Sequence, residues 1–89
     1  MKRVRLFISG EVQGVSFRNF VKRNAVLLNL TGFVRNLDDG NVECVFEGED
    51  ENINQIIGLC RKGPEMSIVK DINIKSEDYS AEFKDFSVL

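Results

Sequence analysis

The sequence of 89 residues has no histidine and no tryptophan, and it contains only one proline and two cysteines. Without histidine, the chain lacks both the usual acid or base of neutral pH and the commonest transition-metal ligand. A catalytic Cys–His pair is therefore excluded. Cys44 and Cys60 are far apart and belong to no Cys-x-x-Cys pattern. We expect them to be buried core thiols and rank a disulfide or a metal site well behind.

Long apolar runs are also missing, and no segment is long enough to span a bilayer. The apolar run near the N-terminus is too short for a signal peptide, so we expect a cytoplasmic protein with no membrane partner. The net charge of −2 gives no global attraction to nucleic acid or anionic lipid. The basic residues Lys2, Arg3, Arg5, Lys22 and Arg23 could raise the positive potential around a functional site, but we expect them mainly to solubilise the protein. The length indicates one domain, residues 1–89, and we expect a monomer.

What the sequence does contain is an alternation of strand-like and helix-like patterns. Val4, Leu6 and Ile8 alternate with polar residues, as in a half-buried strand. Apolar residues from Phe17 to Leu28 recur at helical spacing, and so do those from Ile53 to Cys60. The predicted strands are Arg3–Ser9, Thr31–Leu37, Asn41–Gly48, Ser67–Lys75 and Ala81–Leu89, with a hairpin turn at Asp38–Gly40 and a helix stop at Gly63-Pro64.

The order of these elements, βαββαβ with a further C-terminal strand, favours one architecture. Two helices that each have one apolar stripe need a common sheet to cover. We therefore predict an α+β fold, the ferredoxin-like βαββαβ sandwich, with two helices packed on one face of an antiparallel sheet. Because this fold serves many functions, the function has to be inferred from the residues of a site.

The stretch GEVQGVSFRNF, residues 10–20, places glycines just before the first predicted helix and Arg18 in its first turn. The start of a helix has unpaired backbone N–H groups and is electropositive. Gly14 can take a positive φ at little cost and turn several N–H groups toward one point, forming an anion nest. An arginine is unfavourable there unless its planar guanidinium binds an anion. From composition alone, an anion site and a solvated arginine after an ordinary turn are equally supported.

Two motifs resemble the signatures of the acylphosphatase family. The residues G-E-V-Q-G-V-S-F-R of Gly10–Arg18 match the first signature, G-x-V-Q-G-V-x-F-R, without a mismatch. The stretch Gly32–Gly48, which begins G-F-V-R-N, resembles the second, and the resemblance covers essentially the whole chain. Asn29 stands where the family often has glycine, a replacement that asparagine tolerates. The chain ends Val88-Leu89, where members often have an aromatic residue.

The resemblance implies hydrolysis of acyl phosphates, the mixed anhydrides of carboxylic acids and phosphate, to a carboxylate and inorganic phosphate. It implies that Arg18 binds the phosphoryl group with the loop amides and that Asn36 positions the attacking water. It also implies that no metal and no organic cofactor is used, and we expect phosphate or sulfate to compete with the substrate. The residues expected to bind substrate are Gln13, Gly14, Val15, Ser16 and Phe17, with Gln13 contributing its backbone N–H rather than its side chain.

The residues themselves are consistent with this chemistry. Phosphoryl transfer depends on positioning and on stabilisation of charge, which a nest of N–H groups and an arginine provide. The amide oxygen of Asn36 can accept a proton from water. Because a carboxylate is a good leaving group, a chain without histidine needs no general acid. Without the resemblance, Asn36 is better interpreted as a turn residue before Asp38–Gly40. Arg35 is interpreted as a solvated residue on a strand face.

Two rival interpretations remain. An RNA-recognition motif has the same βαββαβ order, but Gly32-Phe33 lies on the second predicted strand and the third strand lacks paired exposed aromatics. The acidic net charge also disfavours it. The other is an acylphosphatase-like part of a larger maturation enzyme that acts on a carbamoyl phosphate-like substrate. We expect a lone domain that ends at Val88-Leu89 instead.

Overall fold

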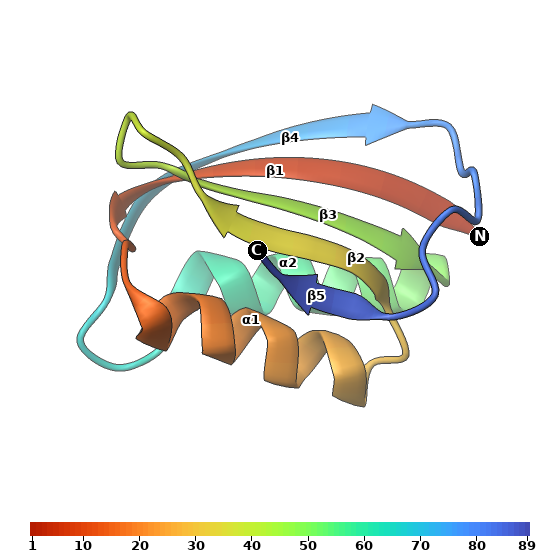
Figure 1. Ribbon diagram of the computed structural model, residues 1–89, viewed down its shortest axis with the longest axis horizontal. Helices are drawn as coiled ribbons and strands as arrows, with labels where there is room; N and C mark the ends of the chain where they lie inside the picture. The colour runs from red at the N-terminus through yellow and green to blue at the C-terminus, as the bar shows by residue number, and fades with distance from the viewer.

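The computed structural model describes residues 1–89 and contains five strands and two helices (Figure 1). Along the chain these are β1 (Lys2–Glu11), α1 (Val15–Leu27), β2 (Thr31–Asn36), β3 (Val42–Gly48), α2 (Asp50–Lys62), β4 (Ile68–Glu77) and β5 (Phe86–Val88). Both helices lie on one face of the sheet (Figure 1). Neither helix has the length and apolar character that crossing a membrane requires.

The strands lie side by side in the order β4-β1-β3-β2-β5. β1 pairs antiparallel with β3 and β4, and β2 pairs antiparallel with β3 as the predicted hairpin. β5 instead runs parallel to β2, with Phe86 opposite Gly32. The predicted ferredoxin-like α+β sandwich is confirmed, but its sheet is mixed rather than wholly antiparallel. The reason is that the chain crosses from β4 at one edge to the opposite edge and enters there in the direction of β2.

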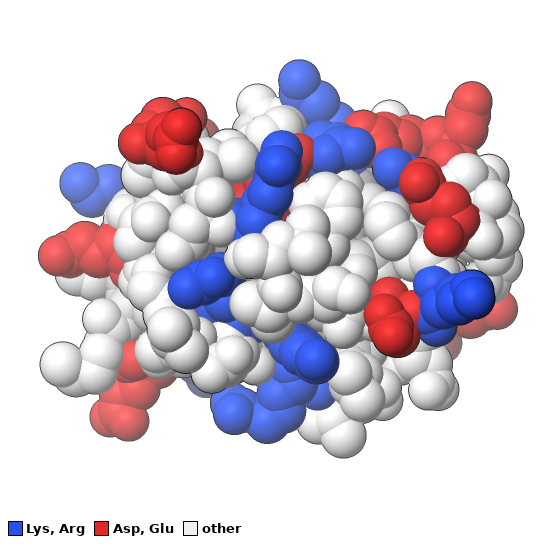
Figure 2. Space-filling model, in the orientation of Figure 1, with Lys and Arg blue, Asp and Glu red and all other residues white.

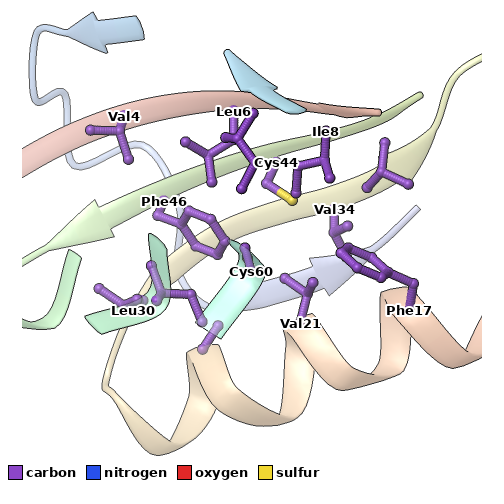
Figure 3. Close-up of a cluster of buried hydrophobic side chains, with 14 of the residues drawn as sticks. Val4, Leu6, Ile8, Phe17, Val21, Leu30, Val34, Cys44, Phe46 and Cys60 are labelled. Atoms are coloured by element: carbon purple, nitrogen blue, oxygen red, sulfur yellow. The ribbon is translucent and has the colours of Figure 1, made fainter. Parts of the chain in front are cut away.

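The core lies between the sheet and the helices, where the predicted apolar faces meet (Figure 3). The two cysteines are part of it: Cys44 on β3 and Cys60 on α2 are free and fully buried, as predicted. Burial raises the pKa of the Cys44 thiol. Other side chains drawn in Figure 3 that are at most 1% exposed are Val4, Leu6, Ile8, Phe17, Val21, Val34 and Phe46. This core fixes the ends of β1 and β2 relative to the start of α1.

The helix ends follow the sequence closely. Asn29, just after α1, has φ 56° and so takes the left-handed conformation that the sequence predicts. Glu49 is the N-cap of α2 but makes no capping bond with its side chain. Asp50 and Glu51 lie in the first turn, where their charge is favourable to the helix dipole. Gly63 follows α2 with φ 70° and ends it.

Only part of the predicted strand Ala81–Leu89 is β structure, because β5 covers Phe86–Val88 alone. The residues before β5 cross the face of the sheet opposite the helices. There the N–H and Oγ of Ser80 donate to Glu47 Oε2 at 3.0 and 3.1 Å. Hydrogen bonds to side chains of the sheet therefore hold this crossing segment in place.

Ion pairs fill that open face of the sheet. Arg3 pairs with Glu47 at 3.3 Å and with Glu77 at 2.8 Å, and Arg5 pairs with Glu77 at 2.7 Å. Arg3 is only 9% exposed. The two arginines are therefore structural cations bound to carboxylates, and the expectation that they mainly solubilise the protein is wrong.

Candidate active site

The connection between β1 and α1 turns at Gly14, which is the N-cap of α1 and has φ 103° and ψ 174°. Residues other than glycine hardly occur in this region of backbone space. A Cβ atom added at Gly14 would meet no atom within 4 Å. The backbone conformation, rather than a shortage of space, therefore requires glycine here, and the expected positive φ is present. Figure 1 shows the connection at the left end of the molecule, where it enters α1.

The five backbone N–H groups from Gln13 to Phe17 have no hydrogen-bond acceptor within the protein. The first turn of any helix leaves such donors unpaired, and no side chain caps α1. No acidic residue lies in its first turn to offset the positive end of the helix dipole. Val15 and Ser16 are exposed, whereas the side chain of Phe17 is buried in the core. The start of α1 is therefore a set of free donors at an electropositive point of the surface.

Arg18 extends from the first turn of α1 to the end of β5. Its Nε lies 3.4 Å from the backbone oxygen of Gly14, and its Nη1 donates to the backbone oxygen of Leu89 at 3.1 Å. Leu89 is held in turn, because its N–H donates to the backbone oxygen of Val34 in β2 at 2.9 Å. A guanidinium has five N–H donors. The structure thus orients Arg18 and leaves further donors of its side chain available beside the free N–H groups.

Asn36 is the last residue of β2 and lies opposite Val42 of β3. The end of β2 and the start of α1 are on the same side of the molecule (Figure 1). The Oδ1 atom of Asn36 is enclosed and has no hydrogen-bond partner. Buried acceptors without partners are unusual in proteins. Nδ2 makes no hydrogen bond within the protein either, so no bond prevents the amide from turning about its last rotatable bond.

Gln13 connects the loop before α1 to the β2–β3 hairpin. Its Nε2 donates to the backbone oxygen of Asn41 at 3.0 Å and lies 3.5 Å from that of Leu37. Leu37 follows Asn36 directly, so the loop and the strand end that carries Asn36 are brought together. Sequence patterns do not indicate Leu37, Asn41 or Leu89 as partners, because every residue has a backbone oxygen and the use of that oxygen depends on the fold alone.

Positive charge gathers along α1. Figure 2 shows Lys and Arg side chains gathered over α1, whereas the acidic side chains lie mainly toward the edges of this view. α1 contributes Arg18, Lys22 and Arg23. An anion that approaches this face therefore meets a positive potential although the chain has a net charge of −2. No group of three or more histidine, cysteine, aspartate or glutamate residues is placed to hold a metal ion.

The open face of the sheet does not resemble a platform for RNA bases. The residues of β3 on that face are Glu43, Val45 and Glu47, and all three are buried. Arg35 of β2 pairs with Glu43 while its side chain stays 49% exposed. RNA-recognition motifs need exposed aromatic side chains on their central strands. β3 therefore offers no exposed aromatic side chain on which a base could stack, and the only aromatic residue of β1 and β3 on this face is the half-buried Phe7 of β1.

Comparisons with known proteins agree with the two motifs. The family model described as Acylphosphatase matches residues 4–88. The acylphosphatase of Syntrophus aciditrophicus (strain SB) is 44% identical over 89 residues, which is 100% of this chain and 93% of that protein. The crystal structure of acylphosphatase from Bacillus subtilis is similar with a TM-score of 0.95 and 34% identity, covering 100% of this chain and 99% of that one. The chain belongs to the acylphosphatase family, and it is an enzyme of that class.

A segment of a longer protein is similar as well. Full-length HypF, solved in a phosphate- and nucleotide-bound form, matches with a TM-score of 0.86 and 30% identity. The match covers 99% of this chain but 12% of HypF. Similarity therefore extends over nearly the full length of a short acylphosphatase and over a small part of HypF.

Proposed function

We propose that this enzyme hydrolyses the carboxyl–phosphate anhydride of acyl phosphates within one domain, residues 1–89. In this proposal the N–H groups from Gln13 to Phe17 and the side chain of Arg18 bind the phosphoryl group, and Asn36 positions the attacking water. The observation that carries the proposal is the set of five unpaired N–H groups next to the oriented guanidinium at the start of α1. Such an arrangement is suited to an anion with several oxygens.

The nest and Arg18 supply electrostatic stabilisation. Phosphoryl transfer has a loose, in-line transition state in which negative charge is spread over the three equatorial oxygens. Donors that are already oriented before the substrate arrives need no reorganisation when this charge develops. Gly14 orients the N–H groups through its backbone, and the bond from Arg18 to Leu89 orients the guanidinium. Both therefore bind the phosphoryl group and lower the barrier to its transfer.

Water is the nucleophile in the proposed reaction. Its oxygen forms a bond to phosphorus while the bond from phosphorus to the acyl oxygen breaks, and the electron pair of that bond leaves with the carboxylate. A proton of the water passes to a phosphoryl oxygen, so the products are a carboxylate and inorganic phosphate. Because the carboxylate leaves without protonation, the step requires no general acid, which suits a chain that has no histidine.

Asn36 is assigned to orienting this water. When its amide turns so that Oδ1 faces the site, the oxygen accepts one water proton and directs the water's lone pair toward phosphorus. The turn breaks no hydrogen bond of Oδ1, because this oxygen has no partner within the protein. We infer that Oδ1, which has no partner within the protein, accepts its hydrogen bond from the attacking water.

The experiment that tests this function is hydrolysis of an aryl acyl phosphate, with a simple phosphate monoester as the control substrate. We expect rapid phosphate release from the acyl phosphate and almost none from the monoester, whose alkoxide leaving group needs protonation. Phosphate and sulfate should inhibit competitively, because they occupy the nest. The Arg18→Ala variant, purified in the same way, excludes a contaminating phosphatase. Equal rates on the two substrates, or no hydrolysis of the acyl phosphate, would contradict the proposal.

A further inference from the structure

The side-chain amide of Gln13 lies between the two parts of the candidate site. The loop before α1 holds the free N–H groups, and the β2–β3 hairpin holds Asn36 at the end of β2. Asn41 uses one backbone oxygen to accept both from Leu37 N–H at 2.8 Å and from Gln13 Nε2 at 3.0 Å. Gln13 is therefore hydrogen-bonded to the hairpin at Asn41, the residue directly before Val42, which is the β3 residue that pairs with Asn36.

No other hydrogen bond joins these two segments. The N–H groups from Gln13 to Phe17 have no acceptor, so they do not fix the loop to the hairpin. Arg18 reaches β2 only indirectly, through Leu89 and its bond to Val34. The two bonds of Gln13 Nε2 to the oxygens of Asn41 and Leu37 are thus the sole hydrogen-bonded link between loop and hairpin.

We propose that Gln13 is a positioning residue that sets the separation between the anion nest and the amide of Asn36. This inference rests on the proposed function, in which the nest holds phosphorus and Asn36 holds the water. In-line attack requires the two reacting atoms to be aligned, and a misplacement of about 1 Å costs about 10²-fold in rate. Because phosphorus and water are bound by different elements, whose ends the core holds only approximately in place, the link between the loop and the hairpin refines their alignment.

The chemistry of the link explains why a glutamine is suited to it. Both partners are backbone oxygens, so the side chain must donate, and an amide does so without bringing a charge toward the anion. A glutamate of the same shape can only accept when ionised and would repel the phosphoryl group. Methionine has a similar length and no donor. The Gln13→Met substitution therefore removes the link while it leaves the backbone N–H and the charge of the loop unchanged.

The test is a double-mutant cycle that measures kcat and phosphate affinity for wild type, Gln13→Met, Asn36→Ala and the double variant. We expect Gln13→Met to lower kcat by about 10- to 100-fold and to change the phosphate Kd by less than about threefold. In the Asn36→Ala background the same substitution should lower the residual kcat by less than about threefold, because there is no oriented water left to misalign. Gln55→Met is the matched control, since the side chain of Gln55 is exposed on α2 and makes no hydrogen bond. The kcat of this variant should equal that of wild type.

The outcomes separate this proposal from the one on which it rests. An equal loss of kcat from Gln13→Met in both backgrounds, or no loss in either, would overturn the positioning role of Gln13 alone. A fully active Asn36→Ala variant would overturn the proposed water-positioning role, and the role of Gln13 with it. Thermal unfolding of all four proteins shows whether a loss of kcat arises from unfolded protein. A merely structural role for Gln13 would lower the unfolding midpoint and leave kcat per folded enzyme unchanged.

Discussion

Replacing Gly14 by alanine tests whether the backbone at the start of α1 forms the anion site. Alanine at φ 103° and ψ 174° is strained by about 1–3 kcal/mol, and the added Cβ meets no atom within 4 Å. The whole cost is therefore backbone strain, which the loop can relieve only by rotating the peptide planes that carry its N–H groups. Loss of one charge-assisted hydrogen bond costs about 1.5–3 kcal/mol, so the phosphate Kd should rise by about 10- to 100-fold.

The assay is phosphate titration by calorimetry, combined with urea unfolding of the same preparations. Gly40→Ala is the matched control, because Gly40 also has a positive φ of 93° and open space for a Cβ but lies in the β2–β3 turn. This control should lose comparable stability and keep its affinity for phosphate. Phosphate should also inhibit the Gly14→Ala variant less than wild type. If Gly14→Ala and Gly40→Ala bind phosphate as tightly as wild type, the loop is not the anion site.

Three further predictions concern cofactors, stability and pH. A strong chelator should leave the rate unchanged. The rate should also be nearly flat between about pH 6 and 8, because the chain has no histidine to titrate there. A bell-shaped profile centred near neutrality would contradict the mechanism. Gly58→Ala, at an exposed position within α2, should raise the free energy of unfolding by about 1 kcal/mol in urea titrations without changing kcat. The hydrogen bond from Arg5, and to a smaller extent the one from Arg3, lowers the pKa of Glu77. The ionised Glu77 therefore stabilises the folded protein above about pH 4.3, and this stabilisation is lost as the pH falls through the lower pKa of the folded state. Glu77→Gln should therefore destabilise the protein at pH 7 and reduce the loss of stability between pH 7 and about pH 3; an unchanged pH dependence would argue against this ion pair.

Local sequence patterns predicted most of the fold, because the side-chain period of each element reports its buried face. The alternation in β1 and the helical spacing from Phe17 onward both correspond to buried faces in the structure. The parallel pairing of β5 could not be predicted, because three residues carry too little pattern and their partner depends on how the chain crosses the sheet. The path of the crossing segment also explains why the expectation that Arg3 is mainly a solubilising charge is wrong. Arg3 is buried because this segment covers it.

The candidate site was predictable where a residue type has a local physical signature. Gly14 before a helix indicates a positive φ, and Arg18 in the first turn indicates an anion, since its charge is otherwise unfavourable there. Asn36 has no such signature, because asparagine is equally suited to a turn, and only its resemblance to a motif residue singled it out. The backbone oxygens that orient Arg18 and Gln13 follow from the tertiary fold and leave no trace in the sequence.

The measurement that tests the central claim most directly compares Arg18→Ala with Asn36→Ala in phosphate titrations and steady-state kinetics. Arg18 is assigned to both binding and transition-state stabilisation, so its removal should weaken phosphate binding and lower kcat by about 10²- to 10³-fold. Asn36 is assigned to the water alone, so Asn36→Ala should bind phosphate almost as wild type does and lose most of its kcat. Asn36→Asp should not restore activity, because its charge repels the anionic substrate. If Asn36→Ala binds phosphate as poorly as Arg18→Ala, or is fully active, the proposed division of roles is contradicted.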